Sequence, residues 1–485
     1  MISAAKASFM VGKKRQINPY LLLILAFLGF VFIGSFLLSM PFAFRNNPNN
    51  EWCHVGSYLD AFFTSLAAMT LTGITSYPEG LANTLSLAGQ IIVLVLVQIG
   101  GLGIVTFLTF FFVLLRRRLQ FKDRLLISQA IAFNNYAEIA KYVRRLIIIT
   151  AVCEIIGIGL GVPVFSAIFP GDAGKIIYYS TFHSISAFNN AGFDLFYGTS
   201  SMIDGLNIAG GNLIDTTNWL YYYCTIYLAV LSLLGGISFL VIIDIIFEHK
   251  PPRRWSSFTK ICLTMTAAII LVMTSLLFLT EGIKEDKPMH FFEALLTILN
   301  CRTAGFSVYP IEDISVPGKM ICGVVMLIGG SPLSTAGGIK VTTIFVIVLA
   351  IISYFRGKVL APFKRVYSYN MIAKSMSLVY VVVAFLLLAF FGLVGFGAKE
   401  ASTLSNEVRE NLVGMYLFEV FSFFGNVGFH TGLESHLSVG SRIILCLVML
   451  VGHIGPMTFF QLFQNNLDKK QIVHYSFVEE DFLIG

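Results

Sequence analysis

Hydrophobic residues along the chain gather into long runs separated by short polar segments. A bilayer core of about 30 Å is crossed by about 20 apolar residues in a helix, and eight runs approach or exceed that length. Four shorter apolar stretches lie between them, too short to cross and long enough to enter and return. The long runs are Tyr20–Phe44, Leu85–Leu115, Leu146–Phe169, Trp219–Phe247, Ile261–Leu279, Met320–Tyr354 (interrupted), Leu378–Phe396 and Arg442–Leu462. The short stretches are Tyr58–Met69, Ile176–Phe188, Met289–Leu299 and Leu412–Phe424.

Composition and charge agree with this pattern. The chain has 485 residues, of which 56% are hydrophobic and 12% are charged, about half the charged share of a soluble domain. The net charge of +6 is unevenly placed, since 23 of the 33 Lys and Arg fall in five segments that share one side if eight spans alternate. The positive-inside rule then places both termini in the cytoplasm and the short stretches outside, and it leaves no role for nucleic acid. The five segments are 1–19, 116–145, 248–260, 355–377 and 464–485.

One unit, consisting of a span, a short stretch, a glycine motif and a second span, occurs four times. The motif glycines are separated by 119, 113 and 123 residues. The sequence therefore predicts an all-α membrane protein with four repeats around one pseudo-four-fold axis. The expected segments are 1–19, repeats at 20–115, 140–247, 257–354 and 371–463, and a tail at 464–485. The motifs are Leu71-Thr72-Gly73-Ile74, Asn190-Ala191-Gly192-Phe193, Thr303-Ala304-Gly305-Phe306 and Asn426-Val427-Gly428-Phe429.

These motifs suit the binding of a monovalent cation. A re-entrant helix points its partly negative C-terminal end toward the membrane middle. Glycine can adopt a positive φ and turn a carbonyl toward an axis, and rings of carbonyls can replace the hydration shell of the ion. The alternative is that each glycine only caps a helix, which would suffice for one motif but accounts poorly for four in register.

A second set of glycines recurs in the span after each motif. Close helix packing and pore-lining kinks are both open for Gly100-Gly101, Gly235-Gly236 and Gly452. The third set differs, because Gly329, Gly330, Ser331, Pro332, Leu333, Ser334, Thr335, Ala336, Gly337, Gly338, Ile339 and Lys340 follow one another inside a span. Proline and glycine break the helix there, so residues 329–340 are expected to form either a polar gate below the motifs or a rigid break.

With these motifs, the sequence resembles the Trk/Ktr/HKT superfamily of potassium transport proteins, most closely its Ktr-type membrane subunit. The resemblance covers nearly the whole chain. Beside the four motifs and the run Ser334–Lys340, it is carried by Gln98–Gly103, Phe121–Leu126, Arg302–Phe306 and Glu479–Gly485.

The resemblance implies K⁺ uptake by a multi-pass protein of the bacterial inner or plasma membrane. It implies a homodimer in the lipid bilayer and a cytosolic ring of nucleotide-binding regulatory subunits as partner. No organic cofactor and no enzymatic activity are expected. Na⁺ could serve as a coupling or activating ion. The implied K⁺ ligands are Thr72, Gly73, Ala191, Gly192, Ala304, Gly305, Val427 and Gly428, with Asn190 and Thr303 beside them.

Three positions depart from the pattern of the family. His453 stands where the last span of the family usually has an arginine facing the pore; it is either part of the gate or a packing histidine. Cys301 replaces a common serine, and Ile74 ends the first motif. Two further charges draw notice: Glu154, inside a span, is expected to face protein, and Arg302 is expected to pair with an outer carboxylate.

Two other classes of function fit the sequence less well. An ion-coupled secondary carrier, such as a K⁺/Na⁺ or K⁺/H⁺ symporter, would predict inverted repeats and paired acids inside the spans, whereas these repeats run in one direction. A membrane enzyme would need His, Asp or Glu at ligand spacing, and the eight histidines are scattered. The sequence therefore favours a cation-translocating protein.

Overall fold

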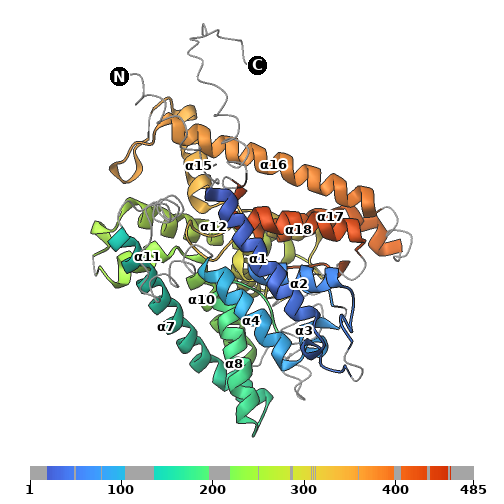
Figure 1. The fold of residues 1–485 in the computed structure, drawn as a ribbon. Helices are drawn as coiled ribbons and strands as arrows, with labels where there is room; N and C mark the ends of the chain where they lie inside the picture. Colours follow the sequence, from blue (N-terminus) through green and yellow to red (C-terminus); the bar gives the residue numbers. More distant parts are fainter. Residues whose placement is uncertain are drawn as a thin grey trace, which may run out of the picture.

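The structure is a computed structural model, and helices make up nearly all of its regular secondary structure (Figure 1). Pairing of extended segments among the described residues is limited to the bridges Phe44–Leu85 and Ile328–Ile339. The expected all-α fold is thus confirmed. The described residues are 19–47, 51–77, 79–103, 136–195, 219–248, 251–284, 288–306, 309, 311, 313–358, 360–397, 406–433, 437–456 and 459.

Four short helices occupy the places of the four short apolar stretches. They are α2 (Tyr58–Thr70), α8 (Ala173–Phe188), α13 (Phe291–Thr303) and α17 (Asn406–Gly425). Each is preceded by one helix, namely α1 (Pro19–Ser39), α7 (Tyr136–Ile168), α12 (Ser257–Glu281) or α16 (Tyr369–Gly397). Each is followed by α4 (Leu87–Leu102), α10 (Trp219–Gly236), α14 (Val316–Leu327) or α18 (Val439–Ile454). The remaining elements are η2 (Pro41–Ala43), α3 (Gly80–Thr84), α11 (Phe239–Ile246), η3 (Pro252–Arg254), α15 (Val341–Arg356) and η4 (Pro362–Lys364).

Local capping chemistry fixes where several of these helices begin. Ser86, Ser315 and Ser438 precede α4, α14 and α18, and each side chain accepts a hydrogen bond from the amide three residues on. Such an oxygen satisfies an amide that the helix itself cannot pair. Asp172 caps α8 in the same way.

Each of the four short helices also contacts a helix of a neighbouring unit, and these contacts form a closed circle. Each packs against the helices on both sides of it in the chain, and also against one helix of a neighbouring unit. The last of these contacts joins the first short helix to the last helix, so the order around the molecule returns to its start. The pairs are α2 with α18, α8 with α4, α13 with α10, and α17 with α14.

Three described helical segments are long and apolar enough to cross a membrane: Lys141–Ile168, Ser257–Glu281 and Tyr369–Gly397. A fourth candidate is the pair formed by Tyr222–Gly236 and Phe239–Ile246, which is bent by 95°. The predicted run Trp219–Phe247 is therefore not one straight helix. Six further apolar helical segments have 10–17 residues. Two of them are α14 and α15, which a loop divides within the predicted run Met320–Tyr354.

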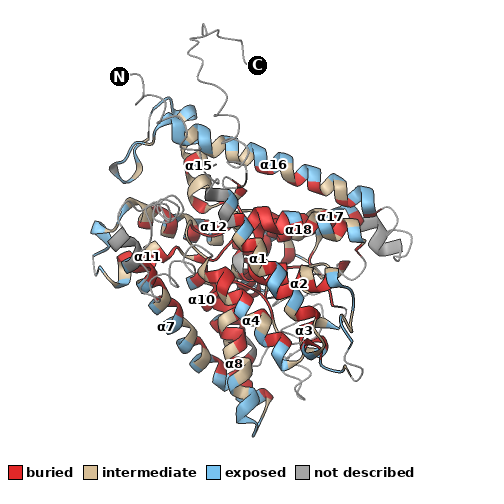
Figure 2. Ribbon diagram, viewed as in Figure 1, coloured by how far each residue is buried: buried red, intermediate tan, exposed pale blue. Residues whose placement is uncertain are grey.

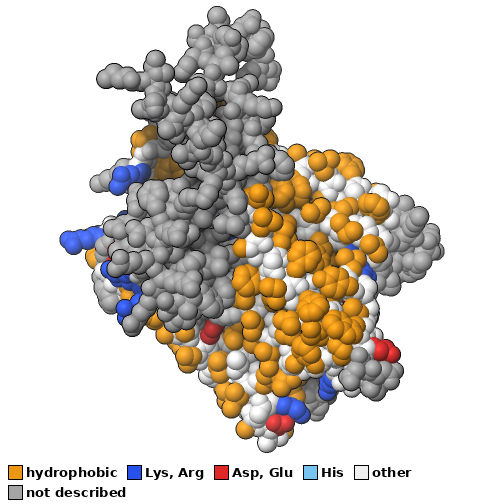
Figure 3. All heavy atoms as spheres, in the orientation of Figure 1, with side chains coloured by type: hydrophobic (Ala, Val, Ile, Leu, Met, Phe, Trp, Pro, Cys, Tyr) orange, Lys and Arg blue, Asp and Glu red, His pale blue; other side chains and the backbone are white. Residues whose placement is uncertain are grey.

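The surface and the interior have the distribution expected of a membrane protein. Buried residues concentrate around α4, α10 and α18 in the middle of the molecule (Figure 2). On the face seen in Figure 3, hydrophobic side chains spread broadly, and the charged side chains lie toward its edges. Exposed apolar residues on α16 such as Leu388 and Phe391 belong to this kind of surface. Lipid tails can cover such a surface, whereas its exposure to water costs free energy.

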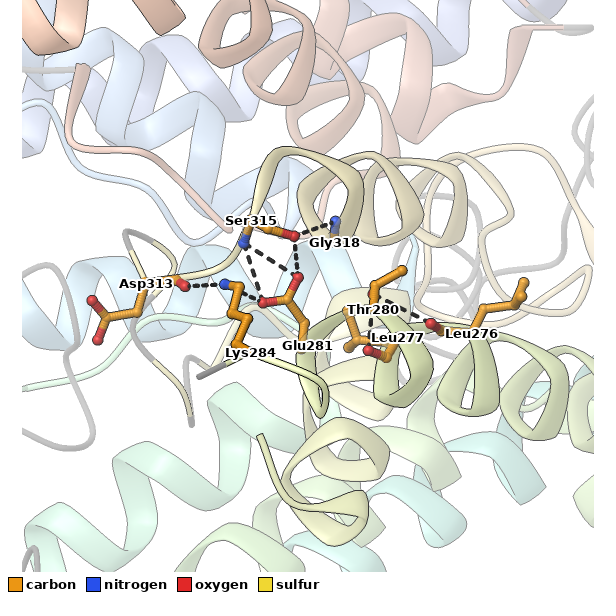
Figure 4. A network of polar contacts seen from close by, with 8 residues as sticks. All are labelled: Leu276, Leu277, Thr280, Glu281, Lys284, Asp313, Ser315 and Gly318. Atoms are coloured by element: carbon orange, nitrogen blue, oxygen red, sulfur yellow. Dashed lines mark hydrogen bonds and ion pairs between the residues drawn. The ribbon is translucent and has the colours of Figure 1, made fainter. Parts of the chain in front are cut away.

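Carboxylates at helix ends stabilise the connections between helices. At the end of α12, Glu281 accepts hydrogen bonds from the amide and hydroxyl groups of Ser315, which caps α14, and it pairs with Lys284 (Figure 4). Lys284 also donates to the carbonyl of Asp313 at 2.8 Å. A comparable ion pair joins Asp60 of α2 to Arg442 of α18. Glu281 and Asp60 thus each hold two helices together.

Candidate functional site

The four short helices all end at the glycine motifs. Each motif glycine has a positive φ, with values of 76°, 68°, 70° and 91° for Gly73, Gly192, Gly305 and Gly428. Side chains are rarely tolerated in this region of backbone conformation, so glycine is needed at all four positions. The preceding residues Thr72, Ala191, Ala304 and Val427 are completely buried.

The motifs interlock through backbone carbonyls. Each glycine lies against the carbonyl oxygen of the residue that precedes the glycine of the next motif. A methyl group on any of the four glycines would overlap or crowd that oxygen, so the loops approach one another more closely than any side chain would allow. The contacts form a closed ring: Gly73 with Ala191 O, Gly192 with Ala304 O, Gly305 with Val427 O, and Gly428 with Thr72 O.

The third motif differs in register from the other three. In the others, the residue two before the glycine (Leu71, Asn190 or Asn426) has a left-handed backbone, with φ of 53–61°. Thr303 instead still belongs to α13, and Ala304 has φ −112°. The helix in the third unit therefore runs further before it ends. The sequence drew attention to Ile74 in the first motif, but the local backbone of that motif matches those of the second and fourth.

Polar side chains support the ring from behind. Asn426 Nδ2 donates to Thr72 Oγ1 at 2.9 Å, which links the fourth motif to the first. Thr72 Oγ1 also lies 2.8 Å from Thr70 Oγ1. Asn190 Nδ2 donates to Thr335 Oγ1 at 2.6 Å, and so links the second motif to the loop that interrupts the sixth apolar run.

That loop, residues 328–340, connects α14 to α15 and is docked on the second unit. Ser331 N donates to Gly236 O at 3.1 Å, Thr335 Oγ1 donates to Gly235 O at 3.0 Å, and Phe239 N donates to Leu333 O at 3.2 Å. The acceptors Gly235 O and Gly236 O lie where α10 breaks, so the bend in one span supplies free carbonyls that hold the break in another.

Within the loop, small residues allow the chain to fold onto itself. Gly329 touches the carbonyl of Gly337, and Gly338 has φ 73°. Gly330 O accepts from Val341 N at 3.2 Å, while Pro332 lies in the turn between these segments. Gly337 also lies against Gly425 and Asn426, at the end of the fourth short helix.

Two basic residues close this part of the chain, one in the loop and one in α18. Lys340 Nζ donates to the carbonyl of Ala336. The His453 imidazole of α18 lies 5.5 Å from the Phe27 ring of α1, measured between centroids. His453 therefore packs on α1, and its part in a gate stays a prediction.

The glycines in the spans also have identifiable neighbours. A methyl group on Gly100, Gly235 or Gly452 would overlap the carbonyl of Met69, Phe188 or Phe424, each near the end of a short helix. Close packing is therefore one role of these glycines. At Gly235-Gly236 the helix also bends, so packing and kinking coincide there.

Comparison with known proteins agrees with this architecture. Residues 46–475 match the TrkH family, described as cation transport proteins. The chain belongs to this family. It is accordingly a multi-pass membrane transport protein and not an enzyme.

Relatives of the chain align with it along almost their whole length. Ktr system potassium uptake protein B of Vibrio alginolyticus is 31% identical over 90% of this chain and 89% of its own. The potassium/sodium uptake protein NtpJ of Enterococcus hirae is 27% identical over 97% and 98% of the two chains. The crystal structure of the potassium transporter TrkH from Vibrio parahaemolyticus superposes with a TM-score of 0.64 at 19% identity, covering 93% of this chain and 86% of that one, which shows a shared fold.

In this TrkH-family chain, the charged residues Arg302 and Glu154 both have polar partners inside the protein. Arg302 is almost completely buried and donates to Thr266 Oγ1 at 3.0 Å; among the described residues it has no carboxylate partner, so the expected pairing is not found there. Glu154 does face protein, where it contacts Asn189 and Gln98. The stretches Phe121–Leu126 and Glu479–Gly485 lie outside the described residues, as does the tail at 464–485.

Proposed function

We propose that the chain is the K⁺-selective translocating subunit of a potassium uptake system. The ion would pass through the ring formed by the four glycine motifs. Support comes from the closed set of glycine–carbonyl contacts, which gathers backbone oxygens from all four units, and from relatives whose names describe potassium uptake. The proposed ligands are the carbonyl oxygens of Thr72, Gly73, Ala191, Gly192, Ala304, Gly305, Val427 and Gly428.

The proposed chemistry is the replacement of hydration water by carbonyl oxygens. A dehydrated cation needs several oxygen ligands at once, and four loops supply them around one axis. The C-terminal ends of α2, α8, α13 and α17 add partial negative charge at the motifs. Each motif has one glycine with positive φ, so the rings are few and moderate selectivity is expected.

The loop at 329–340 would be the gate. Its docked form is held by Gly235 and Gly236 on one side and contacts Asn190 and Asn426 beside two of the filter motifs. Lys340, together with His453 when the imidazole is protonated, would add positive charge below the filter, and K⁺ would meet that charge on its way inward. A neutral His453 would lower this barrier relative to the usual arginine of the family.

Topology and partners complete the proposal. Both termini would be cytoplasmic, and the protein would form a homodimer in the lipid bilayer. A cytosolic ring of nucleotide-binding regulatory subunits would dock on the basic side. Described residues available there include Arg253 and Arg254 in η3 and Arg356 at the end of α15, which complement an acidic partner surface.

The test is ⁸⁶Rb⁺ flux into liposomes that contain the purified full-length chain, with K⁺ and Na⁺ as competitors. Gly305→Ser forces a side chain against the carbonyl of Val427 at a positive φ, a strain of about 1–2 kcal/mol. We expect the K⁺ over Na⁺ preference to fall by roughly fivefold or more. Gly395→Ser, on the open side of α16, is the matched control. An unchanged preference in the first variant would refute the filter assignment, and flux that requires a Na⁺ or proton gradient would favour the carrier alternative.

A further inference from the structure

Glu154 is an acidic residue at an unusual place in this chain. It lies within Lys141–Ile168 of α7, one of the long apolar segments, and its neighbours Ile155 and Ile156 are 67% and 56% exposed on a lipid-compatible surface. Placing an ionisable group within a membrane-spanning segment costs free energy, and residues of this kind commonly have a function. Its side chain is turned inward, toward the end of α8.

The carboxylate takes part in a crowded set of hydrogen bonds. Asn189 Nδ2 lies 3.0 Å from Gln98 Oε1, 3.2 Å from Glu154 Oε1 and 2.9 Å from Ile185 O. An amide nitrogen has two hydrogens, so it cannot serve three acceptors fully. An ionised carboxylate is the strongest of these acceptors. An ionised Glu154 would therefore take a larger share of the two hydrogens of Asn189 than a neutral one.

Asn189 has little freedom to turn elsewhere. Its side chain is 1% exposed, and its Oδ1 atom lies against the Gly101 backbone of α4, where any side chain would overlap it. α7 and α8 are also tied together at this level, since Ser184 Oγ donates to the carbonyl of Glu154 at 2.7 Å. A change in the hydrogen bonding of Asn189 must therefore be passed to its own backbone or to a neighbouring helix.

The backbone of Asn189 leads directly into the second motif. Asn189 is the C-cap of α8, and the next residue, Asn190, has the left-handed φ of 57° that turns the chain toward Ala191 and Gly192. Asn190 also donates to Thr335 of the loop. Asn189 therefore immediately precedes the residue that turns the chain into the second motif and that also holds the loop.

We propose that Glu154 is a positioning residue, whose charged carboxylate orients Asn189 and through it sets the carbonyls of the second motif. This inference rests on the proposed function, because its readout is ion selectivity. Glu154 would thus influence which cation passes, although it lies outside the pore. The effect requires both the negative charge of Glu154 and the amide of Asn189.

The experiment is a double-mutant cycle on the full-length chain in liposomes, read as the apparent KM for ⁸⁶Rb⁺ and the K⁺/Na⁺ competition ratio. Glu154→Gln keeps the shape and removes the charge, and we expect the ratio to fall about threefold to tenfold. Asn189→Ala should lower the K⁺/Na⁺ ratio by a similar factor. The double variant should have the same ratio as Asn189→Ala alone, because Glu154 acts through Asn189. Glu79→Gln, at an exposed position before α3, is the matched control and should leave the ratio unchanged.

A further variant keeps the idea testable if Glu154→Gln does not fold. Ser184→Ala removes the other hydrogen bond between α7 and α8 and leaves both the Glu154 carboxylate and the Asn189 amide, so we expect selectivity to stay within about twofold of the unmodified chain. A loss as large as that expected for Glu154→Gln would show a packing effect and overturn the proposal. Additive losses in the double variant, or no change in Glu154→Gln, would overturn it too. If the unmodified chain takes up no ⁸⁶Rb⁺, the proposed function itself fails.

Discussion

The docking of the loop at residues 328–340 leads to a quantitative prediction. Thr335 Oγ1 is 3.0 Å from Gly235 O, to which it donates, and 2.6 Å from Asn190 Nδ2, from which it accepts. Thr335→Val keeps the shape of the side chain and removes both bonds. The buried carbonyl and amide then lose a partner, at a cost of about 1–3 kcal/mol to the docked loop.

This cost converts into a change in flux if the docked loop is the closed gate. A loss of that size raises the ratio of undocked to docked loop by roughly 5–150-fold. We expect basal ⁸⁶Rb⁺ uptake into liposomes without a cytosolic partner to rise accordingly, until the open state saturates. Thr343→Val makes the same chemical change inside α15, and it should leave basal uptake unaltered.

Two outcomes would contradict a gating role for the docked loop. Unchanged or lower basal uptake in folded Thr335→Val protein would mean that the docked loop does not obstruct the path. An equal rise in both variants would mean that general loosening, and not the two hydrogen bonds, controls the flux. The amount of folded protein is checked by size-exclusion chromatography of each variant in detergent.

Three further predictions concern stability, each measured as thermal unfolding in detergent. Arg442→Gln removes the ion pair with Asp60 and should lower the free energy of unfolding by about 1–3 kcal/mol. Gly101→Ala drives a methyl group against Asn189 and should cost about 1–3 kcal/mol, whereas an alanine at an open helical glycine should cost nothing. The Lys175 amide that donates to Asp172 lowers the pKa of this carboxyl, so its contribution is present above the unfolded pKa and is lost as the pH falls through the folded pKa. Asp172→Asn should therefore show a weaker loss of stability between about pH 5 and pH 2.

Features governed by neighbouring residues could be predicted from the sequence. Hydropathy located the short helices, because an apolar stretch of that length cannot cross a bilayer. Glycine and proline between residues 329 and 338 predicted a break, because they remove helical hydrogen bonds wherever they stand together. The need for glycine at Gly305 follows from its backbone conformation in the same local way.

Features that depend on residues far apart in the chain could not be predicted. Nothing near Thr335 indicates that its partner is Gly235, because the two meet only through the packing of α10 beside the loop. The pairing of Glu154 with Asn189 has the same character. The longer α13 and the contact of Arg302 with Thr266 also depend on three-dimensional packing, since Thr266 lies in a different helix, 36 residues earlier in the chain.

The docking of the loop on the second unit also bears on how the protein is made. Gly235 precedes Thr335 by 100 residues, so at roughly 5–20 residues per second the platform is synthesised about 5–20 s before the loop that binds it. Gly425 and Asn426, which touch Gly337, are synthesised later still. The growing chain therefore meets the first half of the loop's binding surface during translation and the second half near its end. A nascent chain halted after α15 should already hold its loop against α10 while the ring of carbonyls is still incomplete.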